Sequence, residues 1–201
     1  MKIKTLLVFA LAAFSFTPSV FSQFKKKSKS DCNQVVSLSI GTHRLYFDGP
    51  EGINIGFGIE SVVQHYMTFG VELRGYQNKT GYFILDKNQK PIDEITQNKL
   101  ALNLGLNLYP MGALRGFYVG AAIGGVYATK VRDNKPLQWV NGEPQLTNGI
   151  EMRTDVKFGF QHIHKSGFVW GVYGDAGLVM PTLAKETFPM FEVGLKIGKR
   201  L

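Results

Sequence analysis

His164 and Ser166 could support nucleophilic chemistry, since an imidazole beside a hydroxyl can accept the hydroxyl proton. Such a pair also needs a carboxylate that orients the imidazole ring. No Asp or Glu lies at a supporting position on the next expected strand at the same height. We therefore interpret the pair as part of a surface turn and expect no catalytic residue.

Two of the four histidines, His162 and His164, are spaced so that they would share one face of a strand. A protein zinc site needs three or four ligands, and no third histidine or cysteine is near. His43 and His65 stand alone, and Cys32 is the only cysteine. The sequence thus predicts neither a metal site nor a cofactor.

Charged residues occupy alternate positions of residues 151–157, in the order Glu, Arg, Asp, Lys, which places them on one face of a strand. If the turn that follows is centred near Lys165, Asp155 faces Asp175 across neighbouring strands, and such a carboxylate pair can share a proton. The two cations of the same strand lie diagonally close to both carboxylates. Structural neutralisation of the pair is the favoured interpretation.

The elements that carry these residues are strands, because apolar side chains recur at every second position from Val36 onward. Residues 100–108, for example, alternate five leucines with Ala, Asn, Gly and Asn. Eight such segments are each near or above the roughly 9 to 11 residues that a tilted strand needs to cross a membrane. They are residues 35–47, 52–64, 67–78, 97–109, 116–129, 149–162, 168–180 and 188–201. The predicted fold is all-β, an antiparallel transmembrane up-and-down β-barrel of about eight strands.

Short and long links alternate between the segments, as they do in barrels that have short periplasmic turns and longer outer loops. Residues 65–66, 110–115 and 163–167 are short links, and residues 79–96 and 130–148 are long ones. Both long links are expected to be hairpins, since Asn141-Gly142 is a strong two-residue turn signal and residues 86–89 lie between two strand-like runs.

The strand alternation also predicts which side chains point into the barrel. An eight-stranded barrel is just wide enough for side chains to fill it, so we expect a plug of paired charges rather than a channel. Six carboxylates and six cations make up this predicted lumen network: Glu60, Glu72, Glu151, Asp155, Asp175 and Glu192 with Arg74, Lys99, Arg153, Lys157, Lys196 and Arg200.

Aromatic side chains are expected where the strands cross the lipid headgroups. The expected girdle contains Tyr66, Tyr109, Phe117 and Phe168 at the short-turn side, and Tyr46, Phe47 and Tyr127 at the other.

The N-terminus has the order of a secretory signal, with Lys2 and Lys4 before an apolar run at residues 6–16 and small residues up to Ser22. We expect residues 1–22 to be removed, residues 23–33 to form a basic flexible leader and residues 34–201 to form the barrel domain. The chain has a net charge of +8. No cluster of aromatic and basic residues has the character of a nucleic-acid site, so nucleic acid is not an expected partner.

Signal, strand count, link alternation and the closing strand Phe191-Glu192-Val193-Gly194-Leu195-Lys196-Ile197-Gly198-Lys199-Arg200-Leu201 resemble the small OmpA/OmpX-type outer-membrane barrels of Gram-negative bacteria. They resemble more loosely the outer-membrane β-barrel domain proteins of Bacteroidetes. Leu201 departs from the aromatic terminus common in proteobacterial barrels. The His-x-Ser pair at His164 also resembles that of lipid A deacylase barrels, but those enzymes place the pair on the barrel wall in the outer leaflet.

The resemblance implies a non-enzymatic protein of the cell outer membrane whose outer hairpins form an interaction or structural surface. Its expected partners are outer-membrane lipid and lipopolysaccharide, the barrel-assembly machinery, and a surface protein. Lipopolysaccharide phosphates could pair with Arg44, Lys130 and Arg132 near the outer rim. The alternatives are a periplasm-facing assembly or secretion component, a narrow solute channel and a lipid A-modifying enzyme.

Overall fold

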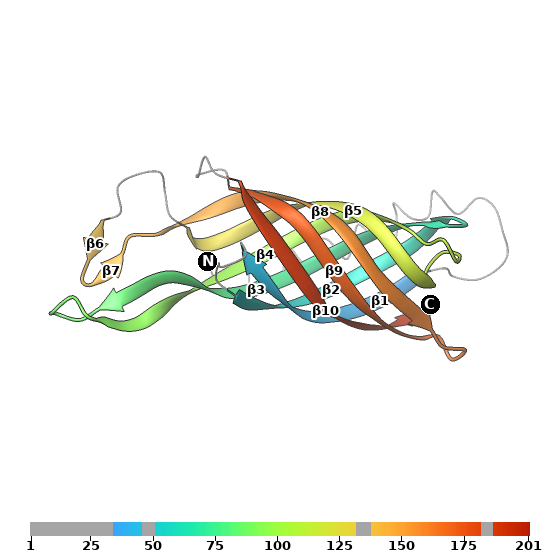
Figure 1. The fold of residues 1–201 in the computed structure, drawn as a ribbon, viewed down its shortest axis with the longest axis horizontal. Coiled ribbons are helices and arrows are strands. Elements are labelled where there is room, and N and C mark those ends of the chain that lie inside the picture. The colour runs from blue at the N-terminus through green and yellow to red at the C-terminus, as the bar shows by residue number, and fades with distance from the viewer. Residues whose placement is uncertain (1–33, 46–50, 132–137, 182–186) are drawn as a thin grey trace. The chain divides into compact units, whose positions relative to one another are not determined.

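Eight antiparallel strands close into a barrel in the computed structural model, which describes residues 34–45, 51–131, 138–181 and 187–201 (Figure 1). The ring order is β1-β10-β9-β8-β5-β4-β3-β2. The strands are β1 (Gln34–Leu45), β2 (Glu51–Gln64), β3 (Met67–Leu85), β4 (Pro91–Leu108), β5 (Gly116–Val131), β8 (Thr147–Ile163), β9 (Phe168–Pro181) and β10 (Phe188–Arg200). The predicted fold class is confirmed. The signal segment and the leader lie outside the described residues and remain predictions.

The period-two pattern decides which side chains face outward. On β1, Leu38 and Ile40 are exposed on the outer surface, whereas Ser37, Ser39 and His43 are buried in the lumen. On β8, Val156 is 55% exposed, and its neighbour Lys157 points into the lumen with a side chain that is 15% exposed. The predicted facing of these two residues is confirmed.

Three short turns lie at one end of the barrel, which we call the short-turn end. They are residues 65–66, 109–115 and 164–167. Two of them are joined, because the Tyr109 and Ala113 amides donate to the carbonyls of Tyr66 and His65 at 2.7 and 2.8 Å. This hydrogen bonding holds the larger turn over the barrel mouth.

The β8–β9 turn differs from the prediction by a shift in pairing. The amide of His164 donates to the Phe168 carbonyl, and Gly167 has a φ of 83°, so the turn comprises four residues, 164–167. As a result Asp175 pairs with Lys157, and Asp155 pairs with Gly177. The expected direct pairing of Asp155 with Asp175 is wrong.

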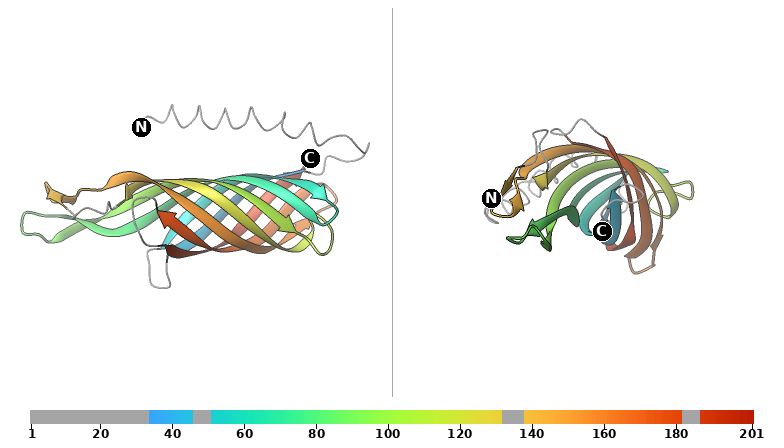
Figure 2. Two further views of the ribbon diagram at one scale, coloured as in Figure 1. Left: turned by 90° about the horizontal axis from the view of Figure 1, so that it is seen from above. Right: turned by 60° about the vertical axis from the view of Figure 1, so that its left-hand side comes forward.

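Strands β3 and β4 continue past the barrel as a two-stranded ribbon at the other end, which we call the long-hairpin end (Figures 1 and 2). The ribbon turn is stabilised by the Asp86 carboxylate, which accepts hydrogen bonds from the amides of Asn88 and Lys90, both at 2.8 Å. The predicted hairpin is confirmed.

A second, small hairpin consists of β6 (Trp139–Val140) and β7 (Glu143–Pro144). Asn141 and Gly142 between them have φ angles of 52° and 78°, as a type I′ turn requires. The Leu85 amide on β3 donates to the Gly142 carbonyl at 2.8 Å, so this hairpin touches the tip of the ribbon. Its prediction from Asn-Gly is also confirmed.

An apolar cluster closes the lumen at the short-turn end. Leu114 inserts from the β4–β5 turn and packs with Val35, Ile163 and Val169, with the half-buried Val62 against them. Leu114 has a φ of 67°, a conformation that is costly for a bulky residue and persists only where the surroundings enforce it. The Gln161 side-chain amide supports this conformation by donating to the Leu114 carbonyl at 2.9 Å.

Among the described residues, no helix is long and apolar enough to span a membrane.

Candidate functional site

Arg74 lies at the centre of an ion-pair network that fills the middle of the lumen. From β3 its guanidinium contacts Glu72 at 2.6 Å on its own strand and Asp175 at 2.9 Å on β9, four strands away in the ring. It also donates to Glu192 on β10 and lies over the Tyr173 ring at 4.8 Å. Since the side chain is only 2% exposed, Arg74 joins opposite walls of the barrel away from solvent.

Arg153 on β8 is the second bridging cation. It contacts Asp155 at 2.5 Å and lies 3.8 Å from Asp175, so this one guanidinium neutralises both carboxylates of the predicted pair. It also donates to the Tyr76 hydroxyl and to Glu192. The two oxygens of Glu192 therefore accept from different arginines, Oε2 from Arg74 and Oε1 from Arg153. We name the set Glu72, Arg74, Arg153, Asp155, Lys157, Asp175 and Glu192 the central network.

Lys157 completes the central network through Glu72, with its Nζ 3.3 Å from Oε2 of that carboxylate. Glu72 also accepts a hydrogen bond from the Ser39 hydroxyl at 3.1 Å. The sequence pairs Lys157 with carboxylates of its own wall, but its closest partner lies across the lumen. The curvature of a closed barrel brings inward side chains of distant strands together, which strand order alone does not reveal.

A second network surrounds Glu60 nearer the short-turn end. One carboxylate oxygen accepts from Thr68 at 2.5 Å and from Asn107 and Tyr109 at 2.8 Å each. The other oxygen pairs with Lys196 Nζ at 3.1 Å. The Tyr109 side chain is fully buried in the lumen. Its predicted place in the headgroup girdle is therefore wrong, because position 109 continues the inward series of β4.

The other predicted girdle residues differ in how far the structure describes them. Tyr66, Phe117 and Phe168 are exposed near the short-turn end, and Tyr127 is half-buried. Tyr46 and Phe47 lie outside the described residues.

The remaining three members of the predicted lumen network lie toward the two ends of the barrel. Lys99 pairs with Glu151 at 2.7 Å on the long-hairpin side. Arg200 lies instead at the short-turn mouth, at the end of β10, where it lines a pocket with Leu114 and Ile163. The structure thus brings eleven of the twelve predicted residues into ion pairs within the lumen and places Arg200 outside that set.

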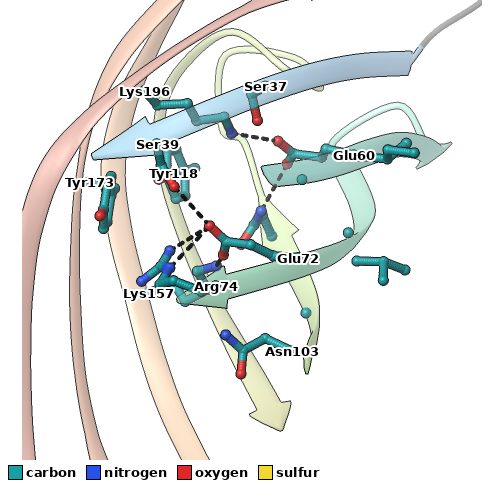
Figure 3. Close-up of a pocket in the computed structure, with 16 residues that line it drawn as sticks. Ser37, Ser39, Glu60, Glu72, Arg74, Asn103, Tyr118, Lys157, Tyr173 and Lys196 are labelled. Carbon is teal, nitrogen blue, oxygen red and sulfur yellow. Dashed lines mark hydrogen bonds and ion pairs between the residues drawn. The ribbon is translucent and has the colours of Figure 1, made fainter. Parts of the chain in front are cut away.

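A polar cavity of about 50 Å³ lies between the Glu60 network and the central network (Figure 3). Glu60, Glu72, Lys157 and Lys196 line it, together with Ser37 and Ser39. A polar space of this size suits a few ordered water molecules rather than a solute. The apolar cluster lies on the short-turn side of this cavity, and the central network lies on its long-hairpin side.

We expect planar-bilayer recordings of the mature protein to show little or no steady current, because packed side chains of the apolar cluster and of the central network fill the lumen on either side of this cavity. The Leu114→Gly variant removes the side chain that seals the short-turn mouth, while the central network stays in place, and it should also fail to conduct. A large, stable conductance step in the unmodified protein would contradict a packed lumen.

Neutral inward residues of the site were not singled out from the sequence, although they hold the ions in place. Tyr76, Tyr109 and Tyr173 donate or accept hydrogen bonds there, and Tyr173 donates to Asn54 at 2.8 Å. The Tyr173 side chain lies against Gly41 and Gly194, where an added Cβ would lie 2.6 Å from its hydroxyl and from its ring, respectively. Large inward side chains opposite inward glycines are the signal that could have identified these positions.

The residues expected to bind lipopolysaccharide do not form one site in the described part of the chain. Arg44 on β1 and Lys130 on β5 are both exposed, but their strands are four apart in a ring of eight and so lie on opposite sides of the barrel. A single phosphate cannot contact both. Arg132 lies outside the described residues.

The His164 ring approaches the Ser166 hydroxyl at 2.9 Å in the exposed β8–β9 turn. The Ser166 amide also donates to the same ring nitrogen at 3.3 Å, which is the pattern of a local turn contact. His162 stacks near Trp170, His65 lies against Tyr66, and His43 is buried edge-on to Tyr76. In the described residues no three His, Cys, Asp or Glu side chains gather as metal ligands would.

Comparison with known proteins finds similarity of fold only. No protein-family model and no curated protein matches the chain. Three solved structures of outer-membrane barrels are similar. The N-terminal β-barrel domain of Pseudomonas aeruginosa OprF is 9% identical, covers 84% of this chain and 99% of its own, and has a TM-score of 0.47. The crystal structure of Yersinia pestis Ail is 11% identical, with coverages of 86% and 100% and a TM-score of 0.47. Ail in a phospholipid bilayer nanodisc is 14% identical, with coverages of 82% and 98% and a TM-score of 0.41.

Proposed function

We propose that the chain is a non-enzymatic integral protein of the bacterial outer membrane, with the long-hairpin end as its interaction surface. The observation that carries this proposal is the distribution of side chains. Buried arginines and carboxylates fill the lumen, while large apolar side chains such as Leu38, Ile55 and Val193 are exposed on the outside. A soluble protein rarely exposes such a continuous apolar surface, whereas hydrocarbon requires one.

The proposed orientation places the short-turn end in the periplasm and the long-hairpin end outside the cell. This follows the usual arrangement of such barrels, in which periplasmic turns are short and outer loops long. The proposal includes removal of residues 1–22, a basic leader at residues 23–33, and insertion by the barrel-assembly machinery.

The ribbon formed by β3 and β4 is the part of the long-hairpin end best suited to bind a protein. Strand β5 pairs with β4 from Lys99 to Leu108, and β4 continues in the ribbon beyond that pairing, back to Pro91. The exposed Ile92 and Phe83 side chains of the ribbon offer apolar contact to a partner. Contact of a surface protein with the exposed side chains of this ribbon is the binding mode that we propose.

The lumen carboxylates support a structural rather than a catalytic role. Each of Glu60, Glu72 and Glu192 already accepts hydrogen bonds or ion pairs from two or more side chains. Paired in this way, buried charges fix the relative positions of the strands.

Fractionation tests the location. We expect the mature protein to be recovered with outer membranes and to migrate at a different apparent mass before and after boiling in detergent, because a barrel resists unfolding in the cold. Recovery of a soluble monomer that needs no detergent would overturn the proposal.

Two lysines in exposed turns test the orientation. In a Cys32→Ser background, Lys87→Cys in the ribbon turn should react with a membrane-impermeant maleimide on intact cells. Lys165→Cys in the β8–β9 turn should react only after the outer membrane is opened. The opposite pattern would show that the ribbon faces the periplasm and remove its role as a surface-exposed site.

A further inference from the structure

A pocket of about 260 Å³ opens at the short-turn mouth, separate from the lumen networks. Its floor contains Val62, Leu114 and Ile163, whose side chains have no polar atoms. Its rim contains His65, Arg115 and Arg200, which come from the β2–β3 turn, the β4–β5 turn and the end of β10. An apolar floor with a basic rim is the complement of a molecule that has an apolar chain and an anionic head.

The pocket is largely preformed. The β4–β5 turn that supplies Leu114 and Arg115 is tied to the β2–β3 turn through the Ala113 amide, and to β8 through the Gln161 side chain. Leu114 is held in a left-handed conformation within the apolar cluster that closes the barrel. A site held in this way loses little conformational freedom on binding, which favours affinity.

The charged side chains around the pocket all have one sign. Among the described residues, the charged side chains outside the lumen at the short-turn end are Arg115, Lys165, Lys199 and Arg200, and all are basic. The described acidic side chains lie in the lumen or toward the long-hairpin end. This asymmetry attracts an anion to the mouth, and arginine suits a carboxylate or a phosphate particularly well because its guanidinium can donate two parallel hydrogen bonds.

We propose that this pocket binds a single-chain anionic amphiphile, with the alkyl chain on the Val62, Leu114 and Ile163 floor and the anionic head at Arg115 and Arg200. A peptide is a poorer fit to such a floor, because its backbone polar groups would need partners there and an alkyl chain has none to satisfy. The head is a carboxylate, as in a fatty acid, or a phosphate, as in a lysophospholipid. The inference goes beyond the proposed function, since it assigns a ligand site to the opposite end of the barrel.

Titration of the full mature protein in uncharged detergent tests this assignment. The probes are dodecanoate and dodecyl phosphate, with dodecanol and dodecyltrimethylammonium as uncharged and cationic counterparts, and the readout is the NMR shift of the Gly112, Ala113 and Arg115 amides. Saturable shifts with either anion, and weaker binding of the other two probes, support the site. The better of the two anions identifies the source as a fatty acid or a phospholipid.

Two double variants distinguish direct contact of the anionic head with the two arginines from general electrostatic attraction to the basic end of the barrel. R115Q/R200Q should weaken binding of the better anion by about tenfold or more, as expected for loss of charge-assisted hydrogen bonds. K165Q/K199Q removes two other positive charges from the same end of the barrel without changing a residue that lines the pocket. It should change binding less than threefold. If R115Q/R200Q does not give a heat-modifiable barrel, R115Q alone in the exposed turn serves the same comparison. Equal effects of the two double variants, or equal binding of dodecanol, would overturn the proposal.

Discussion

Replacing Arg74 with methionine is expected to destabilise the folded barrel by about 3–5 kcal/mol. Methionine preserves much of the side-chain volume but leaves Asp175 without its contact at 2.9 Å and removes one of the two arginines on Glu192. Because both carboxylates are almost fully buried, water cannot replace the lost partner at low cost. The measurement is the free energy of unfolding in denaturant, with the protein refolded into lipid vesicles.

Lys79→Met is the matched control, because it removes a cation from an ion pair of the same strand. Lys79 contacts Glu94 at 3.0 Å in the ribbon, but its side chain is 69% exposed. An exposed pair of this kind contributes about 0–1 kcal/mol. Similar losses in the two variants would show that the central network does not hold the barrel together.

The architecture could be predicted from the sequence because each strand is governed by a local rule. The five alternating leucines of residues 100–108 require one apolar face, whatever the neighbouring strands are. The same rule placed Val156 outside and Lys157 inside. Asn141-Gly142 likewise predicted its hairpin, since the φ angles it needs are local.

The pairing inside the lumen could not be predicted, because it depends on register and on closure of the barrel. The hydrogen-bonded turn at residues 164–167 places Asp155 opposite Gly177 instead of Asp175. The ion pair between Arg74 and Asp175 joins residues 101 positions apart, which no local pattern relates. The position of Arg200 shows a different limit of prediction from sequence. Strand alternation indicates which face of β10 carries Arg200, but it does not show that position 200 lies at the barrel mouth, beyond the lumen networks.

Replacing Val156 with arginine should cost about 2–4 kcal/mol in the free energy of unfolding. Val156 lies near the middle of β8 and faces outward, between Ala121 on β5 and Ala176 on β9. If the outer surface lies in hydrocarbon, the guanidinium must enter a medium that offers it neither water nor a counter-ion. The expected loss therefore comes from membrane depth and not from any contact that valine makes.

Arginine at the two ends of the same strand provides the depth control. Asn148 and His162 are exposed outward positions near the long-hairpin and short-turn ends of β8. Substitution there should cost only about 0–1 kcal/mol, because the side chain reaches the headgroups. A loss of unfolding free energy that is largest at position 156 and small at positions 148 and 162 shows that the middle of the outer surface lies in hydrocarbon. Were the outer surface in water, all three arginines would be tolerated to within about 0.5 kcal/mol, as ordinary surface substitutions are. That flat profile would contradict a membrane-spanning barrel even if the lumen network proved as stable as expected. The stability of the network depends only on closure of the sheet, whereas the depth profile depends only on the medium around the barrel.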